Sequence, residues 1–317
     1  MSDSGMISVL MATHNGADTI DRTLAAMSAL EAPPEGWELV IVNNGSTDDT
    51  EARVLKWKDR LPLKYAVETN LGKSKAMNRA LTMARGDLIV MTDDDVLPDR
   101  DWLVQWRRTA DALPQCTVFG GAILPEFGDT PPSWPMPPAW LTVLYAQTPD
   151  YAEGEIEPYN VSGPNMAIRR SVWERGARLD EKFLVGKYGL MGEDAEFVKR
   201  AHERGHKIGF APRARVRHIV QKDQLSWRWI HHRFFRHGRT MFTLEEVHED
   251  AATKQPSFAF PRWRIRRVAT SFLKLVAALP SLSRQRIFSH TRSIAYDLGA
   301  LKQALVLVKL RRNRRAG

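Results

Sequence analysis

The sequence predicts an α/β fold: a doubly wound, mainly parallel sheet flanked by helices, followed by a helical, basic C-terminal segment. Short apolar runs that suit buried strands alternate with stretches of helical hydrophobic spacing. Polar clusters follow directly after the apolar runs, and positive charge gathers late in the chain. Because ligands of doubly wound sheets bind beyond the carboxyl ends of the strands, we expect these polar clusters to share one site.

The first hundred residues carry the clearest alternation. A near-continuous apolar run such as residues 6–12 is typical of a parallel strand buried on both faces. Apolar residues then recur at helical spacing from Ile20 to Leu30. Ser46 with Asp49 gives the N-cap signal of a second helix, and residues 73–84 predict a third. The four predicted strands are residues 6–12, 39–42, 63–67 and 88–91.

The middle of the chain is less regular. Residues 125–140 hold six prolines and two tryptophans, which predicts a long ordered loop or lid rather than a linker. A strand is predicted at 165–169, a helix at 193–203 and a final strand at 216–220. Beyond Gln224 the chain is predicted to be helical and basic.

Composition narrows the class of protein. With 317 residues, 43% hydrophobic and 26% charged, the chain has the make-up of a soluble globular protein. The single cysteine, Cys116, excludes an internal disulfide and fits a reducing compartment. The first apolar run has no basic residues before it, and no apolar stretch reaches 18 residues, so we expect neither a signal peptide nor a spanning helix. These features predict a cytoplasmic protein.

Charge is distributed unevenly along the chain. Residues 256–317 contain 14 Lys and Arg and one Asp, a net charge of +13. Since the whole chain has a net charge of +9, residues 1–255 carry −4. The basic segment indicates anionic lipid, nucleic acid or an acidic protein surface as a partner.

Three consecutive aspartates follow the predicted strand at 88–91. Asp93 and Asp95 point the same way in an extended chain. Mg²⁺ and Mn²⁺ prefer oxygen ligands, and Mg²⁺ usually takes one or two carboxylates together with substrate phosphate and water. The pattern therefore indicates a metal site, although a solvated turn or helix cap gives the same sequence. His218, in an alternating strand, is either a further metal ligand or a structural histidine.

Two turns contain asparagine. The amides of Asn43 and Asn44 could pair with the edge of a base, or could simply form the turn between strand and helix. The segment from Asn70 to Lys73 is likewise either a turn or a loop that faces base or phosphate. Glu193 and Asp194 open a predicted helix, where acidic residues favour the helix dipole, and a carboxylate there could also act as a general base.

Taken together in this order, the motifs resemble those of family 2 glycosyltransferases of the GT-A fold. Each motif is weak alone, but the resemblance covers residues 6–220 with the segments in the family's order. The carrying segments are residues 8–15, 42–48, 70–73, 93–95, 163–170, 192–194 and 216–218. The chain departs from the family's usual pattern at Ala12, His14 and the pair Asn43-Asn44, where Pro, Tyr and an Asp are common.

The resemblance implies a role for each site. Asp194, beside Glu193, would be the catalytic base. The nucleotide-sugar would be bound by Thr13, Asn15, Asn43, Asn44, Asn70, Gly72, Lys73, Asp93 and Asp94. A Mg²⁺ or Mn²⁺ ion would be held by Asp93, Asp95 and His218, and the sugar and acceptor side would be lined by Gly163, Asn165 and Met166.

The sequence thus predicts an inverting glycosyltransferase that moves a sugar from a nucleoside-diphosphate sugar, with UDP favoured, to an acceptor hydroxyl. The acceptor would be a saccharide or lipid-linked, in polysaccharide or glycolipid assembly. Residues 1–223 would form the catalytic domain, with a nucleotide-sugar half at about 1–122 and an acceptor half at about 123–223. A nucleotidyltransferase and a non-enzymatic lipid- or nucleic-acid-binding protein are the alternatives.

The remaining residues, 224–317, would form the helical, basic region. Residues 227–237 mix aromatic and cationic side chains, and 272–279 and 301–310 are apolar runs with interspersed Lys, too short to span a bilayer. Such helices suit a membrane interface, here the cytoplasmic face. The alternative is a helical subdomain packed on the catalytic core. Nucleic acid is the least favoured partner, because no recognised motif accompanies the charge.

Overall fold

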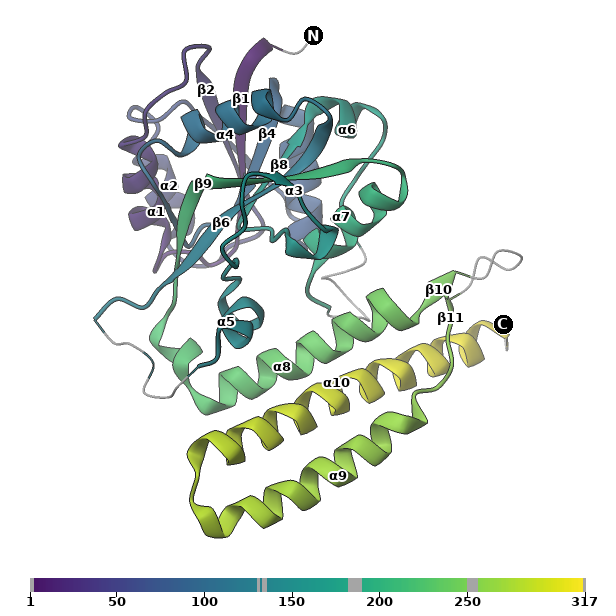
Figure 1. Ribbon diagram of the computed structural model, residues 1–317. Helices are drawn as coiled ribbons and strands as arrows, with labels where there is room; N and C mark the ends of the chain where they lie inside the picture. Colours follow the sequence, from purple (N-terminus) through teal and green to yellow (C-terminus); the bar gives the residue numbers. More distant parts are fainter. Residues whose placement is uncertain (1–2, 130–131, 133–135, 182–189, 250–255, 316–317) are drawn as a thin grey trace. The chain divides into compact units, whose positions relative to one another are not determined.

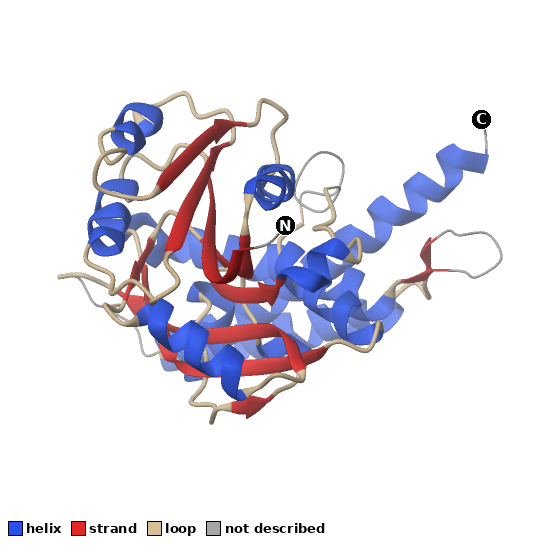
Figure 2. Cartoon of the chain, turned by 90° about the horizontal axis from the view of Figure 1, so that it is seen from above, coloured by secondary structure: helices blue, strands red, loops and turns tan. Residues whose placement is uncertain are grey.

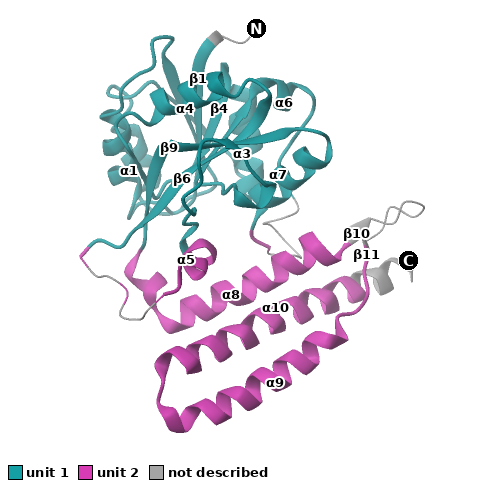
Figure 3. Ribbon diagram, viewed as in Figure 1, with its two compact units in different colours: residues 1–128, 145–185, 192–220 teal, residues 129–144, 186–191, 221–317 magenta. Residues whose placement is uncertain are grey.

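The computed structural model describes residues 3–129, 132, 136–181, 190–249 and 256–315. The chain divides into two compact units (Figure 3). The first comprises residues 1–128, 145–185 and 192–220, and the second comprises 129–144, 186–191 and 221–317. The predicted boundary near residue 223 lies close to the end of the first unit, whereas residues 129–144 group with the second.

A nine-stranded sheet forms the centre of the first unit, in the order β3-β2-β1-β4-β8-β6-β9-β5, with β7 also paired to β9. Six strands point one way, and β8, β5 and β7 run antiparallel to them. The strands are β1 (Asp3–Thr13), β2 (Trp37–Asn43), β3 (Leu63–Val67), β4 (Gly86–Thr92), β5 (Val96–Pro98), β6 (Cys116–Glu126), β7 (Gly154–Glu155), β8 (Asn165–Arg169) and β9 (Lys207–Ile219).

Helices cover the sheet on both faces, which confirms the predicted fold class (Figures 1 and 2). Alternate residues of β1 enter two separate cores, Val9 with the first set of helices and Leu10 with the second. This two-sided burial is why the strand reads as an unbroken apolar run. The first set is α1 (Ile20–Ser28), α2 (Thr50–Leu55) and α4 (Trp102–Ala112), and the second is α3 (Lys73–Met83), α6 (Arg170–Glu174) and α7 (Glu193–Glu203).

Most predicted elements of this unit are confirmed, but its middle is not. The strand predicted at 216–220 is only the end of the long β9. The sequence analysis missed α4, β5 and β6 altogether. The loop predicted at 125–140 is wrong from Pro138 onward, where α5 (Pro138–Tyr145) begins, and its residues 130–131 and 133–135 lie outside the described part of the chain.

The second unit confirms the predicted helical C-terminal segment. Its long helices α8 (Trp227–Met241), α9 (Arg262–Ala278) and α10 (Arg284–Arg315) lie side by side, with α10 between the other two (Figure 1). A π-helical turn, η3 (Phe242–Glu246), extends α8, and a two-stranded pair, β10 (His248–Glu249) and β11 (Pro256–Ser257), follows. In the described part of the chain, no helix is both long and apolar enough to span a membrane.

Two glycines allow α8 and α10 to approach closely. A Cβ atom added at Gly238 would lie 2.0 Å from the carbonyl oxygen of Tyr296, and one added at Gly299 would lie 2.0 Å from that of Phe235. The contacts are reciprocal and both obstacles are backbone atoms, which a side-chain rotation cannot move. The helix crossing therefore requires glycine at both positions.

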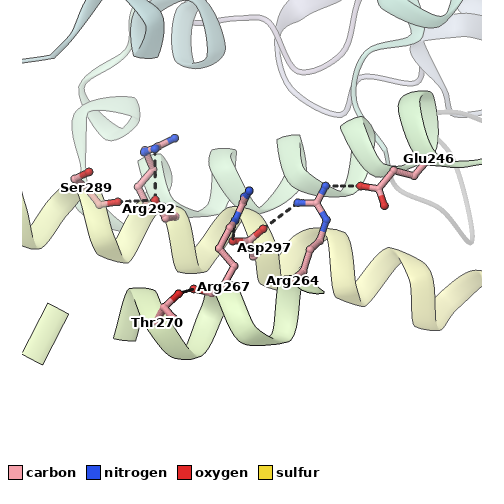
Figure 4. A network of polar contacts seen from close by, with 8 residues as sticks. Glu246, Arg264, Arg267, Thr270, Ser289, Arg292 and Asp297 are labelled. Atoms are coloured by element: carbon pink, nitrogen blue, oxygen red, sulfur yellow. Dashed lines mark hydrogen bonds and ion pairs between the residues drawn. The ribbon is translucent and has the colours of Figure 1, made fainter. Parts of the chain in front are cut away.

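A buried ion cluster holds α9 against α10. The Asp297 carboxylate, on α10, is fully buried and accepts hydrogen bonds from Arg264 (2.9 Å) and Arg267 (2.6 Å) of α9 (Figure 4). Arg264 also donates to Glu246 at 2.5 Å. Removing one partner of such a cluster leaves an uncompensated buried charge, which is strongly destabilising.

The close approach of α8 and α10 predicts that Gly238→Ala destabilises the protein, which is the opposite of what helix propensity predicts. Ala is favoured over Gly in a helix by about 1 kcal/mol, so propensity alone predicts that Gly238→Ala stabilises the protein. Because the added methyl group would overlap the Tyr296 carbonyl, we expect it to lower the free energy of unfolding by about 1–3 kcal/mol. Denaturant unfolding followed by circular dichroism measures this change, and a more stable variant would contradict the crossing.

Candidate active site

A pocket of about 400 Å³ lies where the central strands end. The carboxyl ends of β1, β2 and β4 and the beginning of α3 contribute its walls, as expected for a doubly wound sheet. Its lining residues are Ala12, Thr13, His14, Asn44, Leu71, Gly72, Lys73, Asp93, Asp94 and Asp95. Most of the residues predicted to bind a nucleotide-sugar are therefore brought together.

The amide of Asn44 ties the loop after β2 to the loop between β3 and α3. Its Oδ1 accepts from the backbone N–H of Gly72 (2.6 Å), and its Nδ2 donates to the carbonyls of Glu68 and Asn70 (3.0 Å each). Asn43 is also buried and bonds Tyr65 and the backbone of Ser46 (2.9 Å each). The two amides thus maintain the loop structure here, which is the turn role; pairing with a base remains a prediction.

Side-chain hydrogen bonds also hold the loop that follows β1. Asn15 adopts a left-handed backbone conformation (φ 53°), and its Oδ1 accepts from the N–H of Thr47 at 2.8 Å. The Thr13 hydroxyl donates to the Asp94 carboxylate. A Cβ at Gly16 would lie 2.2 Å from Asp94 Oδ2, so only glycine leaves room for this carboxylate. Asp94 is therefore turned toward the β1 loop.

Asp94 and Asp95 differ in pKa. Burial, together with repulsion from Asp95, raises the pKa of Asp94 to about 7. Burial also acts on Asp95, but the neighbouring His218 outweighs it and lowers the pKa of Asp95. A pKa near 7 leaves Asp94 about half protonated at neutral pH, whereas Asp95 keeps its charge.

Lys73 lies between two carboxylates from distant parts of the chain. Its Nζ is 2.5 Å from Asp93 Oδ1 and 3.6 Å from Glu193 Oε1. Burial lowers the pKa of the Lys73 ammonium, but the carboxylates of Asp93 and Glu193 more than reverse this and raise it. Lys73 is the first residue of α3, so its ammonium group and the helix N-terminus place positive charge at the same edge of the pocket.

Asp95 and His218 form the part of the site that suits a cation. Antiparallel pairing of β5 and β9 sets Val96 opposite His218, which brings the ring Nε2 to 3.2 Å from Asp95 Oδ2. A carbonyl can only accept, so the 2.9 Å contact with the Tyr145 carbonyl assigns a proton to Nδ1 and directs Nε2 toward Asp95. Asp95 Oδ1 is buried without a hydrogen-bond partner in the described part of the chain.

These two residues fit a hard divalent cation with an additional imidazole ligand. The predicted third ligand, Asp93, faces Lys73 instead. Among the described residues, no three His, Cys, Asp or Glu side chains gather in a metal-binding arrangement. The donor set that the structure supports is therefore Asp95 and His218, with the remaining positions open to substrate and water.

Asp194 lies in a smaller cavity, of about 20 Å³, beside Asp93, Lys73 and Met166. Its carboxylate accepts hydrogen bonds from the backbone N–H groups of Gly163 (2.5 Å) and Ala195 (2.8 Å). The half-buried carboxylate is thus fixed in direction by two backbone donors while it lines the cavity. The cavity therefore brings the predicted base, Asp194, close to Asp93 and to the predicted sugar-side residues Gly163 and Met166.

Asn165 has a different place from the predicted one. The residue is fully buried, its Nδ2 donates to the carbonyls of Ala122 (2.9 Å) and Ala214 (2.7 Å), and its Oδ1 accepts from Trp102. All of its amide groups therefore join strands and helix inside the fold. Of the three residues predicted to line the sugar side, Gly163 and Met166 line the cavity beside Asp194.

Three residues of the site had no role assigned from the sequence, although His14 and Leu71 lie in the segments 8–15 and 70–73 that carry the family resemblance. His14 lines the pocket and contacts the Asn44 carbonyl through Nδ1 (2.8 Å). Leu71 also lines it with 53% of its surface exposed. An exposed leucine inside a polar turn is a signal that could have been read from the sequence. Leu179 lines the cavity of Asp194 and had no such signal.

Known proteins resemble this chain in sequence. Residues 8–176 match the family described as "Glycosyl transferase family 2". The succinoglycan biosynthesis protein ExoM of Rhizobium meliloti is 28% identical over 222 residues, 69% of this chain and 68% of that protein. The glucosyl-dolichyl phosphate glucuronosyltransferase of Haloferax volcanii is 21% identical over 255 residues, 80% of this chain and 81% of that protein.

Solved structures share the fold. The mannosyltransferase PcManGT from Pyrobaculum calidifontis, in complex with GDP-Man and Mn²⁺, has a TM-score of 0.63 at 19% identity, covering 94% of this chain and 86% of its own. S. aureus TarS 1–349 in complex with UDP-GlcNAc has a TM-score of 0.55 at 17% identity, with 93% and 90% covered. At these identities the likeness concerns the fold alone.

The role of Asn44 can be tested directly. Asn44→Ala removes three hydrogen bonds, one of them buried and two partly buried, so we expect the free energy of unfolding to fall by about 2–3 kcal/mol. Asn70→Ala, at an exposed neighbour, should change it by less than about 0.5 kcal/mol. Urea unfolding of both variants measures the difference, and equal stability of the two would show that Asn44 does not hold the loops.

Proposed function

The chain belongs to glycosyl transferase family 2, and we propose that the pocket at the strand ends binds a nucleoside-diphosphate sugar whose sugar passes to an acceptor hydroxyl held beside Asp194. The protein is a glycosyltransferase with the GT-A fold. One observation carries the proposal: Lys73 and Asp93 line both the 400 Å³ pocket and the small cavity of Asp194. A donor in the first would present its sugar to a base in the second.

The donor diphosphate is assigned to the edge formed by Lys73 and the N-terminus of α3. An ammonium group and the positive end of a helix dipole both favour a phosphate there. Binding would require Lys73 to exchange part of its pairing with Asp93 and Glu193 for the diphosphate. We favour a UDP-sugar on the family resemblance, and TarS, which binds UDP-GlcNAc in its solved structure, is consistent with that choice.

A Mg²⁺ or Mn²⁺ ion is assigned to Asp95 and His218. The buried, unpartnered Asp95 Oδ1 and the Nε2 atom directed at Asp95 are the supporting observations. When bound, the cation supplies positive charge that stabilises the departing diphosphate. Hydrogen bonding of Nδ1 to the Tyr145 carbonyl fixes the ring orientation that this role needs. The solved mannosyltransferase PcManGT holds Mn²⁺.

Asp194 is assigned as the general base. Its carboxylate takes the proton of the acceptor hydroxyl as that oxygen bonds to the anomeric carbon. The bond from this carbon to the diphosphate oxygen breaks, and the nucleoside diphosphate leaves with the electron pair. Attack opposite the leaving group inverts the anomeric centre. Glu193, paired with Lys73, is a positioning residue.

The acceptor and the place of action are further parts of the proposal. We assign the protein to polysaccharide or glycolipid assembly, with a saccharide or lipid-linked acceptor, at the cytoplasmic face of a membrane. The similarity to ExoM, a succinoglycan biosynthesis protein, and to the H. volcanii glucosyl-dolichyl phosphate glucuronosyltransferase supports this class of acceptor. The basic second unit supports attachment to an anionic membrane surface, with nucleic acid as the disfavoured partner.

Donor turnover tests the function and the metal together. With Mn²⁺ present, we expect one nucleotide-sugar from a panel of UDP- and GDP-sugars to be hydrolysed to the nucleoside diphosphate and free sugar. Asp95→Ala should weaken donor binding at least tenfold, as EDTA should, because both remove the cation. Donor affinity unchanged in EDTA would refute the metal assignment. Release of pyrophosphate would identify a nucleotidyltransferase, and absence of turnover with every donor would indicate a binding protein.

The base is tested by a matched pair of amides. We expect Asp194→Asn to keep the hydrogen bond from Gly163 and the donor affinity, but to lose at least ~10²-fold in kcat. Glu193→Gln removes the neighbouring carboxylate without touching the proposed proton transfer, so its effect should fall mainly on donor KM. Single-turnover assays with saturating donor separate the two, and a kcat within a few-fold of wild type in Asp194→Asn would exclude it as the base.

A further inference from the structure

Helix α9 presents an apolar stripe to solvent. Ile265, Ala269, Phe272, Val276 and Leu279 follow one another at helical spacing on its outer face. The four large members are each 49–56% exposed, and Leu273 beside them is 67% exposed. We call these six residues the outer stripe. Exposed apolar residues are ordinary singly, but a continuous row of this length marks an interaction surface.

The orientation of α9 is fixed by its opposite face. Arg264, Ser271 and Ala278, spaced seven residues apart, are buried. The Asp297 carboxylate of α10 holds Arg264 and Arg267 of α9 in the buried cluster of Figure 4. Turning α9 to bury the outer stripe would break this cluster and bring charged residues to the interior. The exposure of the stripe is therefore built into the packing of the second unit.

The same segment exposes several positive charges. Arg262, Arg266 and Lys274 are exposed on α9, and Arg284 and Arg286 are exposed at the start of α10. The only acidic residue between Pro256 and the last residue of the chain is Asp297, which is fully buried and paired with two arginines. In the described part of this segment, no carboxylate side chain is therefore exposed to solvent.

The combination decides the class of partner. A second copy of α9 would set one group of cations against another, so self-association through this face is opposed by charge. A polynucleotide would match the cations but offers no apolar phase for Phe272 and its neighbours. An anionic bilayer satisfies both halves of the surface, because its headgroups attract the cations and its acyl region takes the apolar stripe.

We propose that α9 lies in the interface of an anionic membrane, with the outer stripe inserted between the lipids and the exposed Arg and Lys side chains at the headgroups. This inference deepens the membrane part of the proposed function and rests on that function only for its purpose, which is to keep the enzyme where a lipid-linked acceptor is presented.

Vesicle flotation of the full-length protein tests the proposal. Wild type should float with vesicles of phosphatidylglycerol and phosphatidylcholine and far less with phosphatidylcholine alone. The triple variant Ile265→Gln/Phe272→Gln/Val276→Gln should bind the anionic vesicles at least tenfold more weakly. The matched control Leu55→Gln/Leu124→Gln/Tyr159→Gln changes three exposed apolar residues of the first unit and should bind within twofold of wild type.

Insertion has its own readout. Because Cys116 is fully buried and is the lone cysteine, Phe272→Cys creates the single accessible thiol, which can carry an environment-sensitive fluorophore. Its emission should shift to the blue with the anionic vesicles, whereas the same label on Lys58→Cys in the first unit should not respond. Raising salt above 0.15 M shortens the Debye length below about 8 Å and should reduce the fraction of protein that binds the vesicles. The label on the protein that stays bound should keep its blue-shifted emission.

The other outcomes are equally definite. Absence of flotation by wild type, or equal binding by the stripe variant and wild type, overturns the proposal. If the stripe variant instead changes the oligomeric state in sedimentation velocity, the face is an interface between two copies. Donor hydrolysis in solution is measured for every variant, since the stripe lies outside the proposed active site. Vesicle binding by a protein without donor turnover would leave this inference standing and remove the proposed function.

Discussion

Burial of the central strands on both faces is the constraint from which the site follows. Val9 and Leu10 enter different cores, and the polar Ser8 between them and the strand start is fully buried and hydrogen-bonded to Glu38 of β2, so it is closed off from a ligand. Polar residues can meet a ligand only where the strands end. Thr13, Asn44 and Asp93 lie at or just past the carboxyl ends of β1, β2 and β4. The order and direction of these strands are enough to bring the three residues together.

The pocket and the adjoining cavity then hold several acidic groups close together. The structure divides them by surroundings: Lys73 compensates Asp93 and Glu193, the β1 loop takes up Asp94, and His218 faces Asp95. The three consecutive aspartates thereby have different partners: Lys73 for Asp93, the Thr13 hydroxyl for Asp94 and His218 for Asp95.

Local pattern was enough to predict the fold and most of the residues that gather at the site. The strand ends, the helix opened by Glu193 and the basic helical segment were all visible in spacing and composition. Pairings between distant segments were not. Asp95 and His218 are 123 residues apart and meet through the register of β5 with β9, a strand of three residues that leaves almost no sequence signal. For the same reason, the sequence could not distinguish Asn165, which joins β8 to its neighbours inside the fold, from a residue that lines the sugar side.

The grouping of residues 129–144 with the second unit has a consequence for how the protein is made. Trp140 of this segment packs against Phe234 of α8 and Phe288 of α10. These partners leave the ribosome long after the segment itself. During synthesis, the apolar α5 is therefore complete before the helices against which it packs, and the strands that follow it are made in between. Synthesis order and spatial order therefore disagree at this segment.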